Sequence, residues 1–357
     1  MSVITTTLQR AWLRRGPLAC ALWPVSMLMW LIVRARRWAS AHGVLAAHAL
    51  PVPVLVVGNR IVGGAGKTPA TIAILQHLQA RGMTPGVLSR GYGVRIDPAQ
   101  PRLLDRHSAA SMGAPDTGDE PWLIFRRTGA PVMVGPKRAW SGQQLLKAHP
   151  DIDILVCDDG LQHLALQRDV EVVVFDERGA GNGWLLPAGP LREPLLTAPG
   201  PGVATPPLVL YNAPAASTWL PGHVGQRQLG MLCALQDWWA GTREVKPPLP
   251  ENTRSAWAIA GIEHPDRFFV ALRAQGWRVR ECPLPDHHDF ATLPWPPEVP
   301  DLIVTEKDAV KLDPHRIARE RPATQVWVAA LDFSPEPSFW NELDAALARL
   351  PRQPQRP

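Results

Sequence analysis

The sequence predicts an α/β protein with a P-loop NTPase-like core on a mostly parallel sheet, a second and smaller α/β domain, and an apolar N-terminal helix. Three patterns lead to this prediction. An apolar run ends in a glycine-rich turn and a helical stretch over residues 55–75. Other apolar runs alternate with helical stretches, as in a parallel sheet covered by helices on both faces. A further apolar run near the N-terminus is flanked by arginines.

Size and composition fit this class. A chain of 357 residues with 46% hydrophobic content is long enough for about two ordinary domains. Its net charge is +5, but the basic residues form no patch with interleaved aromatics, so no nucleic-acid partner is expected. The four cysteines form no CxxC pair, which argues against a zinc site or a disulfide framework and fits a reducing cytoplasm. We expect a monomer.

The first predicted region, residues 1–45, is a membrane-anchoring helix. Its unbroken apolar part, residues 18–33, would reach about 24 Å as a helix, against a hydrocarbon core of about 30 Å. It is therefore marginal as a span, and charge at both ends favours a helix lying in one leaflet. Tryptophans add the aromatic content of an interface. These residues are Arg10, Arg14 and Arg15 before the run, Arg34, Arg36 and Arg37 after it, and Trp23, Trp30 and Trp38.

Two alternatives for this region remain. An apolar run of this length also suits a buried core helix. Residues 39–41 resemble a signal-peptidase site, but three arginines separate them from the apolar run and argue against cleavage. The rest of the chain would then stay in the cytoplasm. Pro24 is expected to kink the helix or delay its start.

The second predicted region, residues 46–211, is a P-loop kinase core. The apolar residues 52–58 suit a buried parallel strand, and residues 68–82 suit a helix that ends at Gly82. The turn between them offers backbone N–H groups to an anion at the helix N-terminus. Lys67 would bridge the β- and γ-phosphates of ATP, and Thr68 would give its hydroxyl to Mg²⁺. The turn consists of Gly63, Gly64, Ala65, Gly66, Lys67 and Thr68.

The turn departs from the standard P-loop pattern, which places a glycine where this chain has Ile61. A second pair of carboxylates supports the nucleotide site. Asp158 and Asp159 follow the apolar strand at residues 151–157, and nucleotides bind at this carboxyl edge of open α/β sheets. One aspartate would hold Mg²⁺ or its water, while the other orients a neighbour. A solvated turn is the alternative.

Two other acidic stretches are less informative by themselves. Asp119 and Glu120 suit the first turn of a helix that contains Pro121. Residues 285–290, PDHHDF, make a poor metal site because consecutive side chains rarely point the same way. A loop histidine that orients a group or carries a proton is the functional interpretation, and surface histidines are the alternative.

The third predicted region, residues 212–357, is the second α/β domain, and the proline-rich residues 199–207 mark its boundary. The pattern predicts a helix that starts at Pro265, runs through Ala274 and stops at Gly276. Strands are expected at residues 255–261, 277–282, 302–307 and 325–331, with a last helix ending near Leu350.

Taken together and in this order, a set of short motifs resembles the tetraacyldisaccharide 4'-kinases of lipid A biosynthesis. The resemblance implies transfer of the ATP γ-phosphate, with Mg²⁺, to the 4'-hydroxyl of an acylated disaccharide 1-phosphate. The reaction would take place on the cytoplasmic face of the bacterial inner membrane, with the enzyme peripheral or monotopic. The motifs are GNRIVGGAGKTP at 58–69, SRGYG at 89–93, GDEP at 118–121, DDGLQH at 158–163, LPAGPLREP at 186–194, DHH at 286–288 and TEKDAVKL at 305–312.

The resemblance also implies roles for individual residues. Asp119 and His287 would form a dyad, with the aspartate as base and the imidazole holding and tuning it. Lys67 would carry part of the electrostatics of catalysis. The further implied sets are Thr68, Asp158 and Glu193 for the metal; Asp159, Gln162 and His163 around the nucleotide and metal; and Arg192 and Tyr92 toward the transferred charge and the substrate.

His287 belongs to the second domain and Lys67 to the first, so closure of the two domains is expected to assemble the site and exclude water. A membrane-associated P-loop switch ATPase or GTPase is the alternative function. Its strongest sign would be an N-K-x-D or T-K-x-D motif, and residues 305–308, TEKD, fail on spacing.

Overall fold

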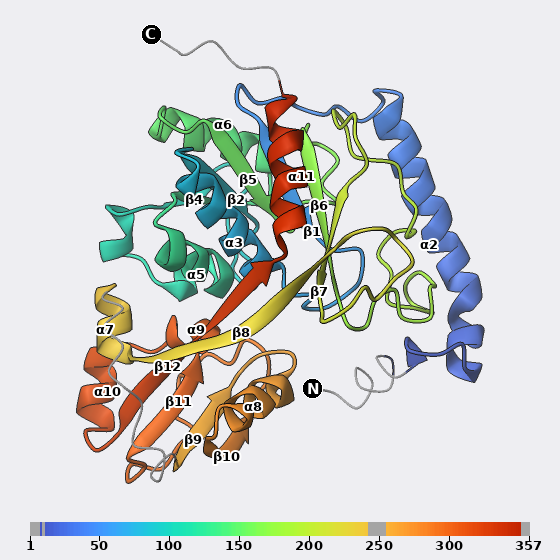
Figure 1. Ribbon diagram of the computed structural model, residues 1–357. Helices are drawn as coiled ribbons and strands as arrows, with labels where there is room; N and C mark the ends of the chain where they lie inside the picture. The colour runs from blue at the N-terminus through green and yellow to red at the C-terminus, as the bar shows by residue number, and fades with distance from the viewer. Residues whose placement is uncertain (1–7, 9–10, 242–254, 351–357) are drawn as a thin grey trace.

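The computed structural model describes residues 8, 11–241 and 255–350, and in them one sheet of twelve strands runs through the molecule (Figure 1). The strand order is β10-β9-β11-β12-β8-β7-β6-β1-β5-β2-β4-β3. The strands are β1 Val54–Gly58, β2 Pro85–Ser89, β3 Arg102–Leu104, β4 Val132–Val134, β5 Ile154–Asp158, β6 Val170–Asp176, β7 Leu208–Asn212, β8 His223–Ala234, β9 Ser255–Ala260, β10 Arg278–Pro283, β11 Asp301–Thr305 and β12 Gln325–Pro335.

The sheet is mostly parallel, which confirms the predicted class. Strands β7, β6, β1, β5, β2 and β4 pair in parallel, and every residue of β1, β5 and β6 is buried. Continuous apolar strands of this kind need helices on both faces. Strands β9, β10, β11 and β12 form a second parallel block. The long antiparallel pair of β8 and β12 joins the two blocks, because β8 also pairs with β7.

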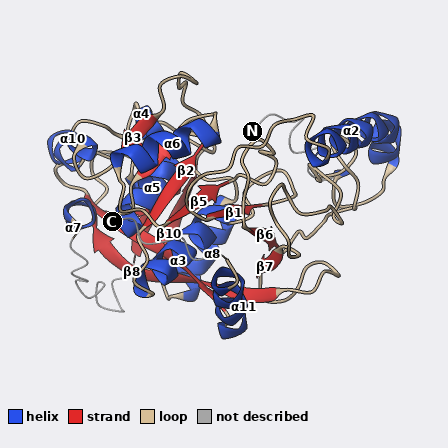
Figure 2. Cartoon of the chain, turned by 90° about the horizontal axis from the view of Figure 1, so that it is seen from above, coloured by secondary structure: helices blue, strands red, loops and turns tan. Residues whose placement is uncertain are grey.

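The helices cover both faces of the sheet (Figures 1 and 2). Helices α3, α5 and α11 share one core with β1, β6 and β7. The last helix thus packs on the nucleotide-binding block, where His77 stacks on Trp340 with ring centroids 4.3 Å apart. The helices are α2 Pro17–Ala41, α3 Lys67–Ala80, η1 Ser108–Ala110, α4 Ala114–Thr117, α5 Asp119–Thr128, α6 Arg138–Ala148, α7 Leu235–Ala240, α8 Pro265–Ala274, α9 Glu306–Ala309, α10 Pro314–Glu320 and α11 Pro337–Ala348.

Helix α2 stands at one side of the molecule (Figure 2). The helix begins at Pro17, because a proline is tolerated in the first turn, where no helical N–H is needed. It then continues through Pro24, so the prediction that Pro24 delays the start of the helix is wrong. Only Ala19 and Ser26 are buried, which overturns the core-helix alternative. Ser26 fastens the inner face, because its hydroxyl donates to the Leu185 carbonyl at 2.8 Å and accepts from the Ala188 N–H at 2.9 Å.

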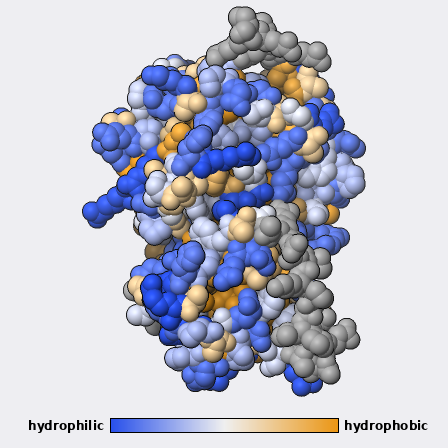
Figure 3. Space-filling model, turned by 90° about the vertical axis from the view of Figure 1, so that its left-hand side faces the viewer, coloured by the Kyte–Doolittle hydropathy of each residue, from blue (hydrophilic) through white to orange (hydrophobic). Residues whose placement is uncertain are grey.

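The outer face of α2 is apolar and exposed. Leu28, Leu31 and Trp38 expose more than half of their surface. By length and composition α2 is able to cross a membrane, and only 11% of its most apolar window is buried. Figure 3 shows the opposite side of the molecule, which is mostly hydrophilic. Arg10, one of the predicted flanking arginines, lies outside the described residues.

Candidate active site

The glycine-rich turn lies between β1 and α3, as predicted. Gly63 and Gly66 have φ values of 92° and 78°, which glycine adopts without strain. A side chain at Gly66 would overlap the Asn212 amide, which donates to the Ala65 carbonyl at 3.2 Å. Asn212 ends β7, so a residue distant in the sequence supports the turn, and no sequence signal pointed to it.

The departure at Ile61 has a structural reason. Its side chain is 1% exposed and packs with Ala65, Leu185 and Leu191, while its backbone bridges to Leu191. An apolar residue at this position therefore fastens the turn to the segment that carries Arg192 and Glu193.

An anionic side chain already contacts the amides of the turn. The Glu263 carboxylate accepts a hydrogen bond from the Gly64 N–H. Arg178 holds both partners, since its Nη2 donates to the Gly64 carbonyl at 3.1 Å and its Nη1 lies 3.8 Å from Glu263 Oε1. Glu263 follows β9, in the part of the chain predicted as the second domain. One backbone N–H of the turn thus points toward a carboxylate oxygen in this structure.

The two aspartates after β5 have different surroundings. Asp158 is buried and accepts from the Thr71 hydroxyl at 3.0 Å. Burial, together with the nearby carboxylates of Glu120 and Asp159, raises the pKa of Asp158 to about 7. Asp159 is partly exposed, and its Oδ1 lies 3.8 Å from Lys67 Nζ and 3.4 Å from Arg192 Nη1. The structure therefore brings Lys67 and Arg192 together on one carboxylate.

Glu193, predicted to bind the metal together with Asp158, has other partners in this structure. Its Oε2 pairs with Arg37 Nη1 of α2 at 2.8 Å, and its Oε1 accepts from Gln162 Nε2 at 2.9 Å. Within the described part of the chain, no group of three Asp, Glu, His or Cys side chains is placed to hold a metal ion. The pKa of His163 is lowered to about 4 by burial and by the neighbouring charges of Arg138 and Arg168, so this imidazole is neutral at neutral pH.

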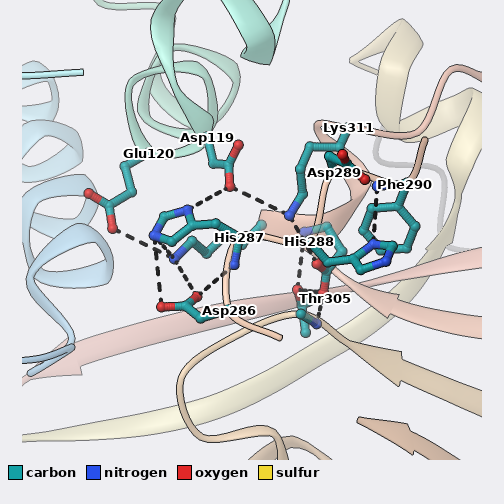
Figure 4. A network of polar contacts seen from close by, with 12 residues as sticks. Asp119, Glu120, Asp286, His287, His288, Asp289, Phe290, Thr305 and Lys311 are labelled. Carbon is teal, nitrogen blue, oxygen red and sulfur yellow. Dashed lines mark hydrogen bonds and ion pairs between the residues drawn. The ribbon is translucent and has the colours of Figure 1, made fainter. Parts of the chain in front are cut away.

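The second cluster of polar residues forms where α5 meets the loop after β10 (Figure 4). Asp119 is the first residue of α5, which agrees with the predicted helix start. Its Oδ2 lies 3.0 Å from Nδ1 of His287, 168 residues away. The two side chains are thus already in contact in this structure. Tyr92 is exposed, and its ring centroid lies 5.4 Å from that of His287.

Two lysines that the sequence interpretation did not select complete this cluster. Lys311 Nζ lies 3.5 Å from Asp119 Oδ2, and Lys307 Nζ lies 3.2 Å from Asp286 Oδ1. Burial alone would raise the pKa of Asp119, but the hydrogen bond from His287 and the charge of Lys311 lower it below its usual value. Both lysines belong to the TEKDAVKL motif at residues 305–312, which was the sequence signal that could have identified them. Thr305 of this motif caps α9 by accepting a hydrogen bond from the Asp308 N–H at 3.2 Å, which gives the start of TEKD a structural role.

Comparisons with known proteins agree on one family. The family model described as Tetraacyldisaccharide-1-P 4'-kinase matches residues 18–348. A Tetraacyldisaccharide 4'-kinase of Methylibium petroleiphilum is 54% identical over 96% of this chain and 94% of its own length. A Tetraacyldisaccharide 4'-kinase of Leptothrix cholodnii is 51% identical over 98% of this chain and 98% of its own length. The crystal structure of the "apo" form of LpxK from Aquifex aeolicus in complex with ATP has a TM-score of 0.75 and 25% identity, covering 93% of this chain and 99% of that one.

Proposed function

The chain belongs to the family of tetraacyldisaccharide-1-P 4'-kinases, and from this premise we propose which residues carry out the reaction and where. It is a kinase that uses ATP to phosphorylate the 4'-hydroxyl of tetraacyldisaccharide 1-phosphate, a lipid A precursor, giving the 1,4'-bisphosphorylated lipid. The observation that carries the site assignment is the 3.0 Å contact of Asp119 with His287, and the next residue, Glu120, is near enough to Asp158 to raise its pKa.

The acceptor hydroxyl is activated by Asp119. The oxygen of the substrate hydroxyl forms a bond to the γ-phosphorus of ATP, and the bond from that phosphorus to the β–γ bridging oxygen breaks. The hydroxyl proton passes to the Asp119 carboxylate. His287 holds the carboxylate through Nδ1. The lowered pKa of Asp119 supports this role, because the group is ionised at neutral pH. Tyr92, exposed beside His287, would contact the substrate sugar or its phosphate.

The nucleotide is held by the amides of residues 63–68 and by Lys67. Phosphoryl transfer depends mainly on positioning and on neutralisation of charge. Lys67 and Arg192, both within 4 Å of Asp159, supply two positive charges for this purpose. Asp159, Gln162 and His163 would line the nucleotide site.

Mg²⁺ fits the carboxylates at the end of β5. Burial and the nearby carboxylates of Glu120 and Asp159 raise the pKa of Asp158, and a divalent cation would relieve this excess of negative charge. Thr68 and Asp158 would hold the ion, and Glu193 would join them once its contacts with Arg37 and Gln162 are exchanged. When bound, the metal neutralises charge on the phosphates.

The outer face of α2 would lie on the cytoplasmic leaflet of the inner membrane. Exposed apolar residues and flanking arginines are the features of helices that bind such interfaces. Arg37 links this helix to Glu193, so the membrane-facing element and the site are in direct contact. We also propose that residues 1–45 act as the anchor, residues 46–211 as the P-loop kinase core that also supplies Asp119, and residues 212–357 as the second α/β unit that supplies His287.

One assay tests the proposal. Purified protein is incubated with ATP labelled at the γ-phosphate, Mg²⁺ and the acylated disaccharide 1-phosphate in detergent micelles. We expect labelled lipid whose new phosphate is on the 4'-oxygen, as phosphorus and proton NMR would show. Consumption of ATP without labelled lipid would contradict the proposal and favour a switch ATPase.

A further inference from the structure

Lys307 and Lys311 belong to one short segment, residues 305–312, which is fixed firmly in place. Thr305 caps α9 by accepting the Asp308 N–H at 3.2 Å. Glu306 pairs with Arg127 of α5 at 2.6 Å, and both side chains are almost fully buried. The segment therefore stays in register with α5, the helix that begins with Asp119. Lys307 lies in α9 and Lys311 in the turn that follows it, where the Lys311 N–H donates to the Asp308 carbonyl at 3.0 Å.

The same segment is also tied to the His287 loop. The carboxylate of buried Asp308 accepts from the Thr305 hydroxyl at 2.7 Å and from the Gly261 N–H at 3.0 Å. The Gly261 carbonyl in turn accepts from the His287 N–H at 3.2 Å. Any side chain at Gly261 would crowd Asp308, since its Cβ would lie 2.8 Å from Oδ1. Asp119, His287 and the two lysines thus share one rigid frame.

Lys311 is aimed at the carboxylate of the dyad. Its side chain is only 7% exposed, and Nζ lies 3.5 Å from Asp119 Oδ2 and 3.3 Å from Asp308 Oδ1. Asp119 Oδ2 therefore contacts both the Lys311 ammonium group and the His287 imidazole (Figure 4). Among the described residues, no hydrogen bond or ion pair reaches Asp119 Oδ1. Oδ2 of Asp119 is held in place by these two contacts, and Oδ1 is available to the substrate hydroxyl.

Lys307 is aimed at the imidazole. Its Nζ lies 3.4 Å from Nε2 of His287, 3.2 Å from Asp286 Oδ1 and 3.9 Å from Glu120 Oε1. An ammonium group can only donate, so a hydrogen bond between the two requires Nε2 to accept. The ring proton then lies on Nδ1, where it is donated to Asp119. A second proton on the ring would place two positive charges 3.4 Å apart, which Lys307 opposes, although Asp286 Oδ2 lies 3.8 Å from the same nitrogen.

We propose that Lys311 and Lys307 are positioning residues of the phosphoryl-transfer site: Lys311 holds Asp119 ionised with Oδ1 free, and Lys307 fixes His287 in its neutral Nδ1–H form. This inference rests on the proposed function of the dyad. The substrate hydroxyl gives its proton to Asp119 Oδ1 as the bond to phosphorus forms, while His287 and both lysines keep their protons. The imidazole therefore orients the base and takes no proton itself.

The charged and titratable groups around Asp119 come from every element packed against it. The α5 start supplies Glu120, the loop after β10 supplies Asp286 and His287, the 89–93 loop supplies Tyr92, and the α9 segment supplies Lys307, Asp308 and Lys311. Burial opposes ionisation of Asp119, whereas His287, Lys311 and Lys307 favour it. Loss of Lys311 must therefore raise the pKa of Asp119.

The first test replaces each lysine by methionine and by arginine in the full-length enzyme. For Lys311→Met we expect kcat to fall about tenfold or more, as for other groups that orient a reacting residue, with KM for ATP within about twofold. The acid limb of the kcat profile moves to higher pH. For Lys307→Met we expect a loss of similar size, because His287 Nε2 then loses the ammonium group that lies 3.4 Å away and holds the ring in place. Arginine should restore much of the activity at either position.

Lys147→Met on the exposed surface of α6 is the matched control, and it should leave kcat and the pH profile unchanged. Near-normal kcat and an unshifted pH profile in Lys311→Met would overturn the role of Lys311. The same result in Lys307→Met would overturn that of Lys307. If the wild-type enzyme labels no lipid, the proposed function is wrong. If Asp119→Asn keeps normal activity, the proposed dyad is wrong. Both results differ from those that would overturn the roles of the lysines.

A measurement on the wild-type enzyme does not depend on whether the variants fold. Imidazole ¹⁵N chemical shifts, assigned through His287→Gln, report which ring nitrogen of His287 carries the proton. We expect a protonated Nδ1 and a bare Nε2 at neutral pH. A charged imidazolium or an Nε2–H tautomer would sink the assignment to Lys307.

Discussion

The two ends of the proposed site are built in different ways. The phosphate end consists of consecutive residues, 63–68, between β1 and α3, and it offers mainly backbone amides. The acceptor end consists of charged side chains from three segments, of which Asp119 and His287 are 168 residues apart. Backbone geometry at the first end is set locally by glycine conformation. Side-chain geometry at the second end depends on how α5, the His287 loop and α9 are held together.

This difference predicts different responses to substitution. At the phosphate end, changes in charge or in glycine should act on nucleotide binding and on electrostatic stabilisation. At the acceptor end, changes should lower turnover and leave nucleotide affinity nearly unaltered. Four substitutions, in order of decreasing effect, test this division.

Lys67→Met should be the most damaging. It removes the ammonium group that faces the triphosphate, and loss of such preorganised charge costs about 10³-fold in kcat. The measurement is lipid labelling under saturating ATP and substrate, with Lys147→Met as a control of equal charge change. Labelling at the wild-type rate would disprove the assignment of the whole phosphate end.

Asp119→Asn should lower kcat by about 10²-fold, the lower end of the usual contribution of a general base, without weakening nucleotide binding. His287→Ala should cost less, since the imidazole only orients the carboxylate. The double variant should lose little more than Asp119→Asn alone, because the two residues act as a unit. A clear loss of ATP affinity, measured by calorimetry, would show that the two ends are not separable.

Gly66→Ala tests the backbone of the phosphate end against a matched glycine. Both Gly66 and Gly82 have φ near 80°, but an added Cβ meets Asn212 at Gly66 and nothing within 4 Å at Gly82. We expect Gly66→Ala to weaken ATP binding about tenfold or more. Gly82→Ala should cost about 1 kcal/mol of stability and leave ATP binding intact. Equal effects on ATP binding would mean that backbone strain, and not the Asn212 contact, decides the outcome.

Glu263→Gln should have the smallest effect, and in the favourable direction. Its carboxylate competes with phosphate for the Gly64 N–H, so its neutralisation should lower KM for ATP by about two- to tenfold with kcat unchanged. Exposed Glu298 provides the control Glu298→Gln. An increase in KM would show that Glu263 supports the nucleotide site and does not compete with it.

The same contrast explains what could be predicted from the sequence. The strand, turn and helix around Lys67 and the buried strand before Asp158 follow from short stretches of sequence, because each depends on local periodicity and on glycine. Asp119 and His287 looked structural by themselves, and only the family resemblance selected them. Their contact is a property of the tertiary frame.

The remaining residues of the site left weaker signals or none. Asn212 and Glu263 meet the turn from distant strands, and nothing in their local sequence indicates it. Lys307 and Lys311 lie in a motif that was part of the family resemblance, but no role was assigned to either lysine. Glu193 pairs with Arg37 because α2 packs beside it, a contact that no local pattern determines. The antiparallel pairing of β8 with β12, which makes the sheet continuous, likewise depends on long-range register.

The position of α11 has a consequence for synthesis of the chain. Phe339 and Leu343 of this last helix are fully buried in the core that supports the nucleotide-binding turn. On the ribosome, α2 therefore emerges roughly 15 to 60 s before that core can close, at a translation rate of about 5–20 residues per second. A nascent chain therefore has time to reach the bilayer before the core that includes α11 is complete.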